Sequence, residues 1–262
     1  MNRSQGLPGA ELRDKVVFVT GGGSGIGAAI SEGFGRCGAR VGVHFHQTGR
    51  TQISALKKRI NAVGAEVATF QGDLTSVAAC NAVVQQVVEH FGRLDVLINN
   101  AGSMVARRRL EEIDDQFLDQ VFDLNARSVV TTCRAVLPVF IQQGSGCIVN
   151  VSSISARTGG SPGSSIYSAS KAFVNTFTRS LARELAESNI RVNALSPGTI
   201  DTAFHEQFSS REKLENTRGT IPMQRLGQAE DCVGTALYLA AEGLSGYVTG
   251  QIIEVNGGQL MA

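Results

Sequence analysis

The sequence has few cysteines, and their arrangement excludes two common ways of stabilising a small domain. Five cysteines are scattered along 262 residues, with no Cys-x-x-Cys pair and no spacing typical of a zinc site. We therefore expect neither a disulfide framework nor structural zinc. The four histidines, His44, His46, His90 and His205, also lack the spacing of metal ligands, so no metal is expected. A reducing cytoplasmic compartment fits this cysteine usage best.

Long apolar runs and an excess of either charge are also missing. No stretch of about 18 uninterrupted apolar residues occurs, and residues 1–15 lack the apolar segment of a signal peptide, which disfavours membrane spanning and secretion. The 24 basic and 23 acidic residues nearly cancel, so no global charge favours nucleic acid or a membrane surface as a partner. The one basic run, Arg107–Arg109, is followed closely by four acidic residues and is interpreted as surface.

Internal repeats, low-complexity tracts and Pro- or Ser-rich linkers are absent as well. A chain of 262 residues without such boundaries is expected to form one domain with a substantial core. We expect residues 1–12 to be a flexible arm and residues 13–262 to form the domain.

Short runs rich in Val and Ile alternate with longer helical patterns along the whole chain. The runs expected to be strands are 15–20, 40–46, 66–71, 94–99, 147–152, 191–195 and 251–255, and helices are expected near 25–37, 50–63, 76–91, 115–142, 166–188 and 228–242. This alternation predicts a doubly wound, Rossmann-like α/β fold, in which helices cover both faces of a seven-stranded parallel sheet. The segment at about 199–220 looks irregular and is long enough to cover a substrate.

A glycine-rich turn lies between the first expected strand and the first expected helix. Two spacings overlap in it: Gly23, Gly25 and Ala28 fit G-x-G-x-x-G/A, and Gly21, Gly25 and Gly27 fit G-x-x-x-G-x-G. Glycine allows a sharp turn and a close approach of the backbone to a ligand, and the start of a helix attracts a pyrophosphate. The turn therefore predicts a dinucleotide site.

Tyr167 is followed four residues later by Lys171. On a helix these two side chains share a face, with Cβ atoms about 5–6 Å apart. The ammonium group and the helix N-terminus both favour the phenolate, so the pKa of Tyr167 is expected to fall from about 10 toward neutrality. Such a tyrosine can act as a general acid and base. The pair alone is a weak signal, because Tyr-x-x-x-Lys also occurs on ordinary amphipathic helices.

Taken together, these motifs resemble the classical short-chain dehydrogenase/reductase family. The resemblance covers roughly residues 12–260 and depends on motifs in the family's order, namely Thr20-Gly-x-x-x-Gly25-x-Gly27, Asp73, Asn99-Asn100-Ala101-Gly102, Asn125, the serines near 153, Tyr167-x-x-x-Lys171 and Pro197-Gly198. It implies an oxidoreductase that transfers a hydride between a nicotinamide dinucleotide and a carbonyl/alcohol substrate. A homotetramer is implied as well.

The resemblance implies a role for each catalytic residue. Tyr167 would exchange a proton with the substrate oxygen, and Lys171 would lower the pKa of Tyr167 and hold the nicotinamide ribose. Asn125 would hold a water molecule that links Lys171 to solvent.

A serine would bind and polarise the substrate oxygen. Relatives usually carry this serine thirteen residues before the tyrosine, where this chain has Ile154. We assign the role to Ser153, which requires a one-residue insertion within residues 156–165. Ser152 and Ser155 remain alternatives, and such serines also end strands by bonding to their own backbone.

The resemblance also implies a cofactor site along the chain. The residues expected to contact the dinucleotide are Gly21, Ser24, Gly25, Ile26 and Gly27 in the turn, His46 and Arg50 after the second strand, Asp73 and Leu74 by the adenine, Asn100, Ala101 and Gly102 along the cofactor, Tyr167 and Lys171, and Pro197, Gly198, Ile200 and Thr202 near the nicotinamide carboxamide.

The end of the second strand is expected to select the dinucleotide. No carboxylate stands in 43–50 to accept hydrogen bonds from an NAD ribose, and an acidic side chain about 4 Å from a 2′-phosphate would cost up to about 4 kcal/mol. His46 and Arg50 are therefore expected to favour NADP(H). Ser24 stands where many NADP-preferring relatives carry a basic residue, so NAD(H) remains an alternative.

Two other functions are compatible with this fold. One is a catalytically silent regulatory or scaffold protein that binds the dinucleotide, and the other is an isomerase or epimerase that oxidises its substrate transiently. The substrate is left open, because the segment at 199–220 offers apolar side chains such as Phe204 as well as polar ones such as His205 and Lys213.

Overall fold

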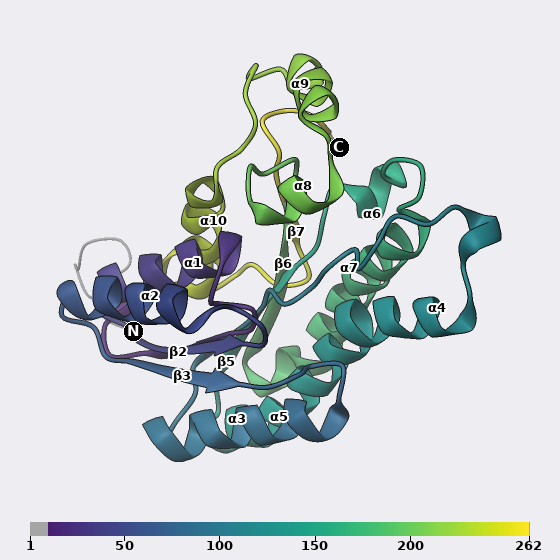
Figure 1. Ribbon diagram of the computed structural model, residues 1–262. Helices are drawn as coiled ribbons and strands as arrows, with labels where there is room; N and C mark the ends of the chain where they lie inside the picture. The colour runs from purple at the N-terminus through teal and green to yellow at the C-terminus, as the bar shows by residue number, and fades with distance from the viewer. Residues whose placement is uncertain (1–9, 262) are drawn as a thin grey trace.

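The computed structural model describes residues 10–261, without the side chains of His205 and Glu206. Its centre is one sheet of seven parallel strands in the order β3-β2-β1-β4-β5-β6-β7 (Figure 1). The strands are β1 (Val16–Val19), β2 (Arg40–Phe45), β3 (Val67–Gln71), β4 (Val96–Asn99), β5 (Gly146–Val151), β6 (Ile190–Pro197) and β7 (Ile252–Val255). The doubly wound α/β fold expected from the sequence is confirmed.

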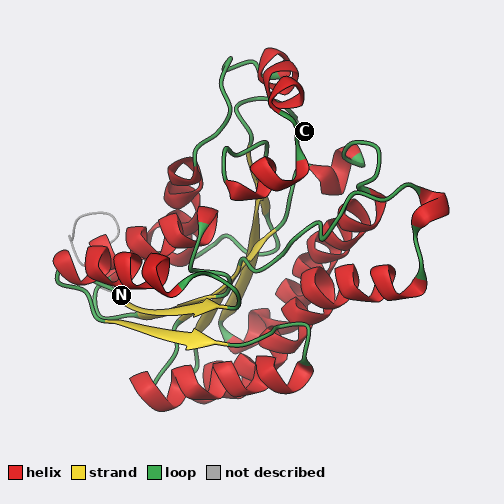
Figure 2. Cartoon of the chain, in the orientation of Figure 1, coloured by secondary structure: helices red, strands yellow, loops and turns green. Residues whose placement is uncertain are grey.

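Helices cover both faces of the sheet (Figure 2). The longer ones are α1 (Gly25–Arg36), α2 (Arg50–Ala62), α3 (Val77–Phe91), α4 (Asp115–Phe122), α5 (Ser128–Gln143), α7 (Ser165–Leu185), α9 (Arg211–Thr220) and α10 (Val233–Ala240). Short elements are η1 (Ala10–Leu12), η2 (Leu110–Glu112), η3 (Asp123–Arg127), α6 (Ser155–Thr158), η4 (Ala186–Ser188), α8 (Ala203–Phe208), η5 (Ala229–Cys232) and α11 (Glu242–Ser245).

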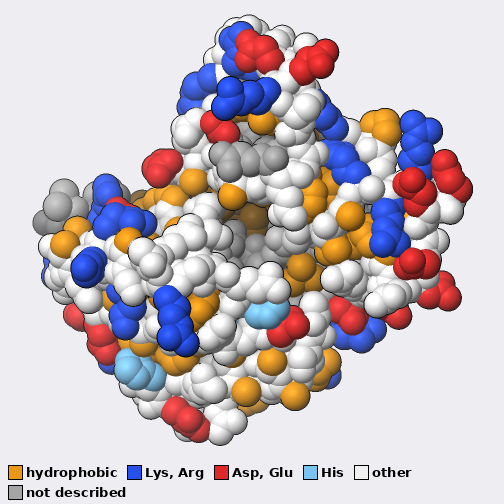
Figure 3. Space-filling view, in the orientation of Figure 1, with side chains coloured by type: hydrophobic (Ala, Val, Ile, Leu, Met, Phe, Trp, Pro, Cys, Tyr) orange, Lys and Arg blue, Asp and Glu red, His pale blue; other side chains and the backbone are white. Residues whose placement is uncertain are grey.

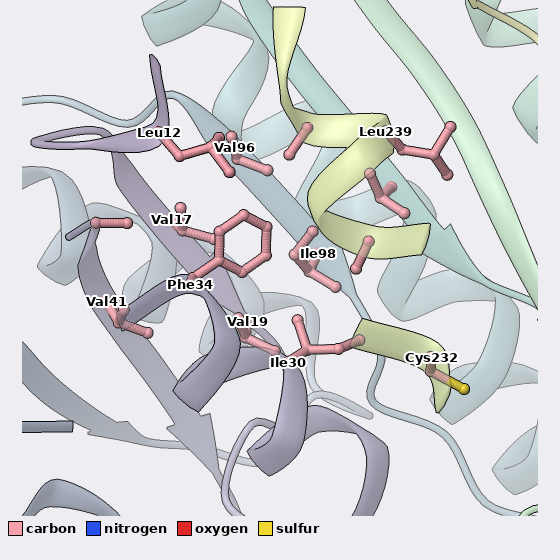
Figure 4. Close-up of a cluster of buried hydrophobic side chains, with 14 of the residues drawn as sticks. Leu12, Val17, Val19, Ile30, Phe34, Val41, Val96, Ile98, Cys232 and Leu239 are labelled. Atoms are coloured by element: carbon pink, nitrogen blue, oxygen red, sulfur yellow. The ribbon is translucent and has the colours of Figure 1, made fainter. Parts of the chain in front are cut away.

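Two buried hydrophobic clusters hold the layers together. In the first, Phe34 and Ile30 of α1 pack with Leu239 of α10 against β1, β2 and β4 (Figure 4). In the second, side chains of α3, α5 and α7 pack against the opposite face around Phe18 and Ile148. Every residue of β1 and β4 is buried, as expected for central parallel strands covered on both sides.

The segment expected to be irregular contains two helices, α8 and α9. The Ser210 hydroxyl accepts a hydrogen bond from the Lys213 N–H at 3.2 Å and caps the start of α9. This segment has little apolar periodicity, so its helices cannot be predicted from the hydrophobic pattern. The prediction of irregular structure for this segment is therefore wrong. Residues of the segment do line the cavity of the candidate site.

The end of the expected N-terminal arm is also structured. Residues Ala10–Leu12 form η1, and the side chain of Leu12 is only 2% exposed in the first hydrophobic cluster. The rest of the expected arm, residues 1–9, lies outside the described residues. Within residues 10–261, no helix combines the length and the apolar character needed to cross a membrane.

Candidate active site

A cavity of about 570 Å³ opens at the carboxyl ends of the strands. The strand order reverses around β1, and in open α/β sheets such a crevice is where ligands bind. Its walls come from the turn after β1, the loop after β4, the end of β5, the start of α7, the end of β6, and α8 with α9. Figure 3 shows this face of the molecule hollowed below α8, between α1 and α7.

The glycine turn before α1 forms one wall of the cavity. Gly21 and Gly25 have positive φ angles of 59° and 50°, which disfavour a side chain. A Cβ on Gly27 would lie 2.3 Å from the Gly21 carbonyl oxygen and 2.5 Å from Nδ2 of Asn100. The spacing Gly21, Gly25 and Gly27 therefore describes this turn, and its exposed backbone beside a helix start fits a pyrophosphate.

Gly27→Ala is expected to weaken dinucleotide binding at least about tenfold, because the added methyl group displaces the Gly21 carbonyl from a turn that must fit the pyrophosphate closely. Fluorescence titration with NADPH and NADH measures the change. Gly49→Ala is the matched control, since a Cβ there would have no neighbour within 4 Å. Equal affinities for the two variants would contradict the role of the turn.

His44 stabilises this turn through a hydrogen bond, a role that is not predicted from the sequence. Nδ1 of His44 accepts a hydrogen bond from the Gly21 N–H at 3.0 Å, and Nε2 lies 3.0 Å from the Gly72 carbonyl oxygen. These partners require a neutral ring protonated at Nε2. Burial lowers the pKa of His44, which favours the same neutral form.

Tyr167 and Lys171 lie together in the first turns of α7, where Nζ of Lys171 is 5.8 Å from the centre of the tyrosine ring. The ammonium group donates a hydrogen bond to the Val151 carbonyl oxygen at 2.9 Å. Lys171 is 3% exposed, and burial lowers its pKa to about 8. The pair therefore lies on one helix face, as the spacing predicts.

The lowered tyrosine pKa expected from the sequence is wrong for this structure. Burial raises the pKa of Tyr167 to about 12, and a hydrogen bond with Ser153 opposes that rise only in part. Lys171 lies over the ring, and its proton is directed at Val151. Loss of hydration therefore outweighs the opposing effect of Ser153, and Tyr167 is a protonated phenol at neutral pH.

Among the three candidate serines, Ser153 is the one close enough to Tyr167 to oppose the rise in the tyrosine pKa. Its hydroxyl also donates to Oγ of Ser155 at 3.0 Å and accepts from the Ser155 N–H at 3.1 Å. Ser152 turns away and donates to the Lys171 carbonyl oxygen at 3.4 Å. The geometry supports the assignment of Ser153. Ile154, which stands thirteen residues before Tyr167, does not take this role.

Asn125 lies in η3, a π-helical turn that interrupts the long helix expected at 115–142. Its amide donates to the carbonyl oxygens of Ser103 and Val121 at 2.7 and 2.8 Å, and its Oδ1 accepts from the Ser103 N–H at 3.1 Å. Such π-turns often occur at functional sites. A Cβ on Gly102 would lie 2.7 Å from Oδ1 of Asn125 and 3.1 Å from Nζ of Lys171, so both groups approach the same backbone.

Most of the residues expected to bind the cofactor border this cavity. Those that line it are Gly21, Ser24, Gly25, Ile26, Asn100, Ala101, Gly102, Tyr167, Lys171, Pro197, Gly198, Ile200 and Thr202. The expected residues that do not line it are Gly27, His46, Arg50, Asp73 and Leu74. Of these, Leu74 is 3% exposed, and Arg50 begins α2 at the surface.

The sequence shows no carboxylate at the end of β2, but the structure places one there from another strand. Oδ2 of Asp73, which follows β3, lies 4.0 Å from Nε2 of His46, and both side chains are about half exposed. Neighbouring parallel strands bring their carboxyl ends to one edge, so an acidic group distant in sequence reaches this position.

Two cationic side chains of the cavity need separate mention. Arg107, interpreted as surface from its sequence, is partly buried and lines the cavity together with Lys213 of α9. A sequence signal for Arg107 is its place in the loop after β4, at the sheet edge where ligands bind. The side chain of His205 lies outside the described residues. Across residues 10–261, no cluster of three or more His, Cys, Asp or Glu side chains is placed to hold a metal ion.

The fold and this arrangement of Ser153, Tyr167 and Lys171 beside a glycine turn define a dinucleotide-dependent oxidoreductase. The family model described as enoyl-(acyl carrier protein) reductase matches residues 21–259. The chain belongs to the short-chain dehydrogenase/reductase family. It is an enzyme of the reductase type within that family, and its cofactor is a nicotinamide dinucleotide.

The chain is similar over nearly its whole length to proteins of known activity. It is 34% identical over 254 residues to a 3-oxoacyl-(acyl-carrier-protein) reductase of Synechocystis sp., covering 95% of this chain and 98% of the relative. It is 36% identical to NADPH-dependent aldehyde reductase 1, chloroplastic, of Arabidopsis thaliana, covering 97% and 89%. The solved structure of NADH-dependent reductase A1-R′ complexed with NAD aligns at 34% identity with a TM-score of 0.86, covering 97% and 100%.

Proposed function

We propose that this protein reduces a carbonyl compound to an alcohol with NADP(H), using Tyr167 as the general acid. The observation that carries the proposal is that Tyr167, Ser153 and Lys171 line one cavity that the glycine turn also borders. Relatives named as 3-oxoacyl and aldehyde reductases support the reductive direction.

The nicotinamide cofactor, when bound, supplies the hydride. Gly21, Gly25 and Gly27 leave the backbone free to approach its pyrophosphate. In the reductive direction Ser153 binds the carbonyl oxygen, and Tyr167 donates its proton to that oxygen as negative charge develops there. A phenol that is protonated at neutral pH is suited to this step.

Lys171 supports the proton transfer. With a pKa of about 8 its ammonium is mostly charged at neutral pH, and it stabilises the phenolate that Tyr167 becomes after donation. Asn125 lies next to the same backbone and is suited to hold the water molecule through which the proton is replaced. These roles extend the expectation from family resemblance and are supported by the contacts of the two side chains.

The proposed activity is tested with purified protein, NADPH and a panel of aldehydes, ketones, sugars and 3-oxoacyl thioesters. Loss of reduced nicotinamide absorbance and formation of the alcohol are both followed. We expect turnover with at least one class. Tight NADPH binding without turnover on any member of the panel would favour a catalytically silent binding protein.

The preference for NADP(H) is proposed from His46 and Arg50, which stand where a 2′-phosphate is expected. Relatives and solved structures include both an NADPH-dependent and an NADH-dependent reductase, so the family alone leaves the choice open. Asp73 opposes a phosphate from its position 4.0 Å from His46, and the basic pair must outweigh it.

His46→Asp is expected to lower NADPH affinity at least about tenfold and to leave NADH affinity within about twofold, because a second carboxylate would then repel the phosphate. Fluorescence titration with both nucleotides measures the ratio. Asn61→Asp, which adds a charge at the exposed end of α2, is the matched control. A wild-type protein that binds NADH tenfold more tightly than NADPH would overturn the proposed preference.

Assembly and location are proposed from the family. We propose a homotetramer in the cytoplasm, with a small molecule as substrate. Light scattering during size-exclusion chromatography tests the tetramer, and a single peak at 27.7 kDa would contradict it.

A further inference from the structure

The loop after β4 places Arg107 at the cavity in a fixed position. Nε of Arg107 donates to the Phe208 carbonyl oxygen at 2.7 Å, and one terminal nitrogen donates to the Pro162 carbonyl oxygen at 3.2 Å. The other N–H groups of this guanidinium make no hydrogen bond to a residue within the described part of the chain. The side chain therefore ties two walls of the cavity together and keeps donors free.

Backbone strain lies two residues before this arginine. Val105 has a φ of 65°, which is unfavourable for a β-branched side chain. The turn is held by hydrogen bonds from the Val105 N–H to Oγ of Ser103 at 3.1 Å and from the Ala106 N–H to the Met104 carbonyl oxygen at 2.8 Å. Strain of this kind persists where the surrounding structure requires it and is common at ligand sites.

Lys213 brings a second positive charge to the same cavity from the first turn of α9. It is partly buried, and burial together with the charge of Arg107 lowers the pKa of Lys213. The two cations are thus close enough to repel each other. Figure 3 shows basic and acidic side chains together over α9, above the hollow.

The charges of these two cations are not balanced by an acidic partner among the described side chains. Other arginines differ, because Arg108 pairs with Asp114 at 3.0 Å and Arg225 pairs with Asp231 at 2.6 Å. Like charges brought together in a partly desolvated cavity are unfavourable unless an anion binds between them. A carboxylate or phosphate would accept charge-assisted hydrogen bonds from both.

We propose that the substrate is a carbonyl compound that carries a carboxylate or phosphate group, and that Arg107 and Lys213 bind this group. The inference rests on the proposed reductase function and names its substrate class. The anion is not altered by the reaction, because the hydride and the proton from Tyr167 both go to the carbonyl group.

The position of the pair favours the substrate over the cofactor. Arg107 contacts the loop before α7 and the end of α8, and a Cβ on Gly163 would lie 3.1 Å from Cβ of Arg107. The dinucleotide is expected at the glycine turn, where a Cβ on Gly25 would lie 3.6 Å from Cγ2 of Thr202. Removal of the two charges is therefore expected to leave cofactor affinity unchanged.

The test compares matched substrates that differ in one anionic group. Succinic semialdehyde is compared with butanal for the carboxylate arm, and glyceraldehyde 3-phosphate with glyceraldehyde for the phosphate arm. We expect the wild-type protein to favour the anionic member of at least one pair about tenfold or more in kcat/KM. The substrate pair with the larger ratio shows whether the bound group is a carboxylate or a phosphate.

Arg107→Gln and Lys213→Gln are each expected to reduce that ratio about threefold or more, mainly through KM, and the double variant to reduce it to about one. The dissociation constant for NADPH should remain within about twofold of wild type. Arg109→Gln and Arg211→Gln are the matched controls, because these exposed cations lie on the same two segments and do not line the cavity.

The outcomes separate this inference from the proposed function. Reduction of neutral aldehydes with no preference for anionic ones, or a preference that Arg107→Gln and Lys213→Gln leave intact, would overturn the inference and keep the reductase. Without turnover on any substrate, the reductase proposal fails, and calorimetric titration of succinate and of inorganic phosphate into NADPH-saturated protein decides the anion site. Binding of either ion that the double variant loses would support the site, and equal or absent binding would refute it.

Discussion

Tyr167→Phe is expected to lower kcat by a factor of about 10²–10⁴ while NADPH affinity stays within about twofold. The substitution removes one oxygen and keeps the ring that packs beside Phe204, with ring centres 5.8 Å apart. It therefore removes the proton donor with little change in shape. Steady-state rates measured on the substrate found by the panel, together with a fluorescence titration of NADPH, give both quantities.

Tyr238→Phe is the control for this prediction, since Tyr238 lies on α10 with 37% of its surface exposed. Its rate should equal that of the wild type. Thermal unfolding of both variants checks that the fold is intact. If Tyr167→Phe kept more than about a tenth of wild-type kcat, another group would have to donate the proton, and the assignment of Tyr167 would be abandoned.

Lys171→Met is expected to abolish most activity and, in the ligand-free protein, to raise stability. Burial lowers the pKa of Lys171 to about 8 from its ordinary value of 10.5, a difference of about 3 kcal/mol against the charged form. Methionine fills a similar volume without a charge, so we expect a gain of about 1–3 kcal/mol at neutral pH after the bond to Val151 is lost. Denaturant unfolding measures the gain.

The pH dependence of stability provides a second measurement on the same variant. Because the pKa of Lys171 is lower in the folded state, the unfolded state binds more protons between pH 8 and about 10.5. Wild-type stability should therefore gain a contribution as pH rises through about 8–9, where Tyr167 stays protonated in both states. Lys171→Met should lack this contribution.

Lys58→Met is the control, because Lys58 lies on the exposed face of α2 and its replacement should change stability by less than about 0.5 kcal/mol. A Lys171→Met protein that is less stable than wild type at neutral pH would show that the ammonium is well solvated or paired. That outcome would contradict the conclusion that burial destabilises the charged form of Lys171 in the folded protein.

The sheet is predictable from the sequence because buried parallel strands form continuous apolar runs. Val16–Val19 and Val96–Asn99 are such runs, and each was located to within a few residues. The glycine turn is predictable for a similar reason, since it depends on local backbone requirements at Gly21, Gly25 and Gly27. Local pattern reports local conformation well.

The parts that escaped prediction depend on contacts between distant segments. Arg107 resembled a surface cation because its partners, Pro162 and Phe208, are 55 and 101 residues away. The pKa of Tyr167 does not follow from the sequence, because the spacing to Lys171 predicts proximity and gives no measure of burial. The pKa of a side chain depends on its burial and its neighbours in the folded structure, and the spacing of two residues does not report these.

We propose above that this chain moves a hydride and a proton onto a substrate carbonyl, with the proton coming from Tyr167. NADPH carrying deuterium at the transferable position tests it most directly. We expect one deuterium on the alcohol carbon for each NADPH consumed, with this reaction nearly lost in Tyr167→Phe. NADPH consumed without a labelled alcohol, or equal labelling by the Tyr167→Phe protein, would contradict it.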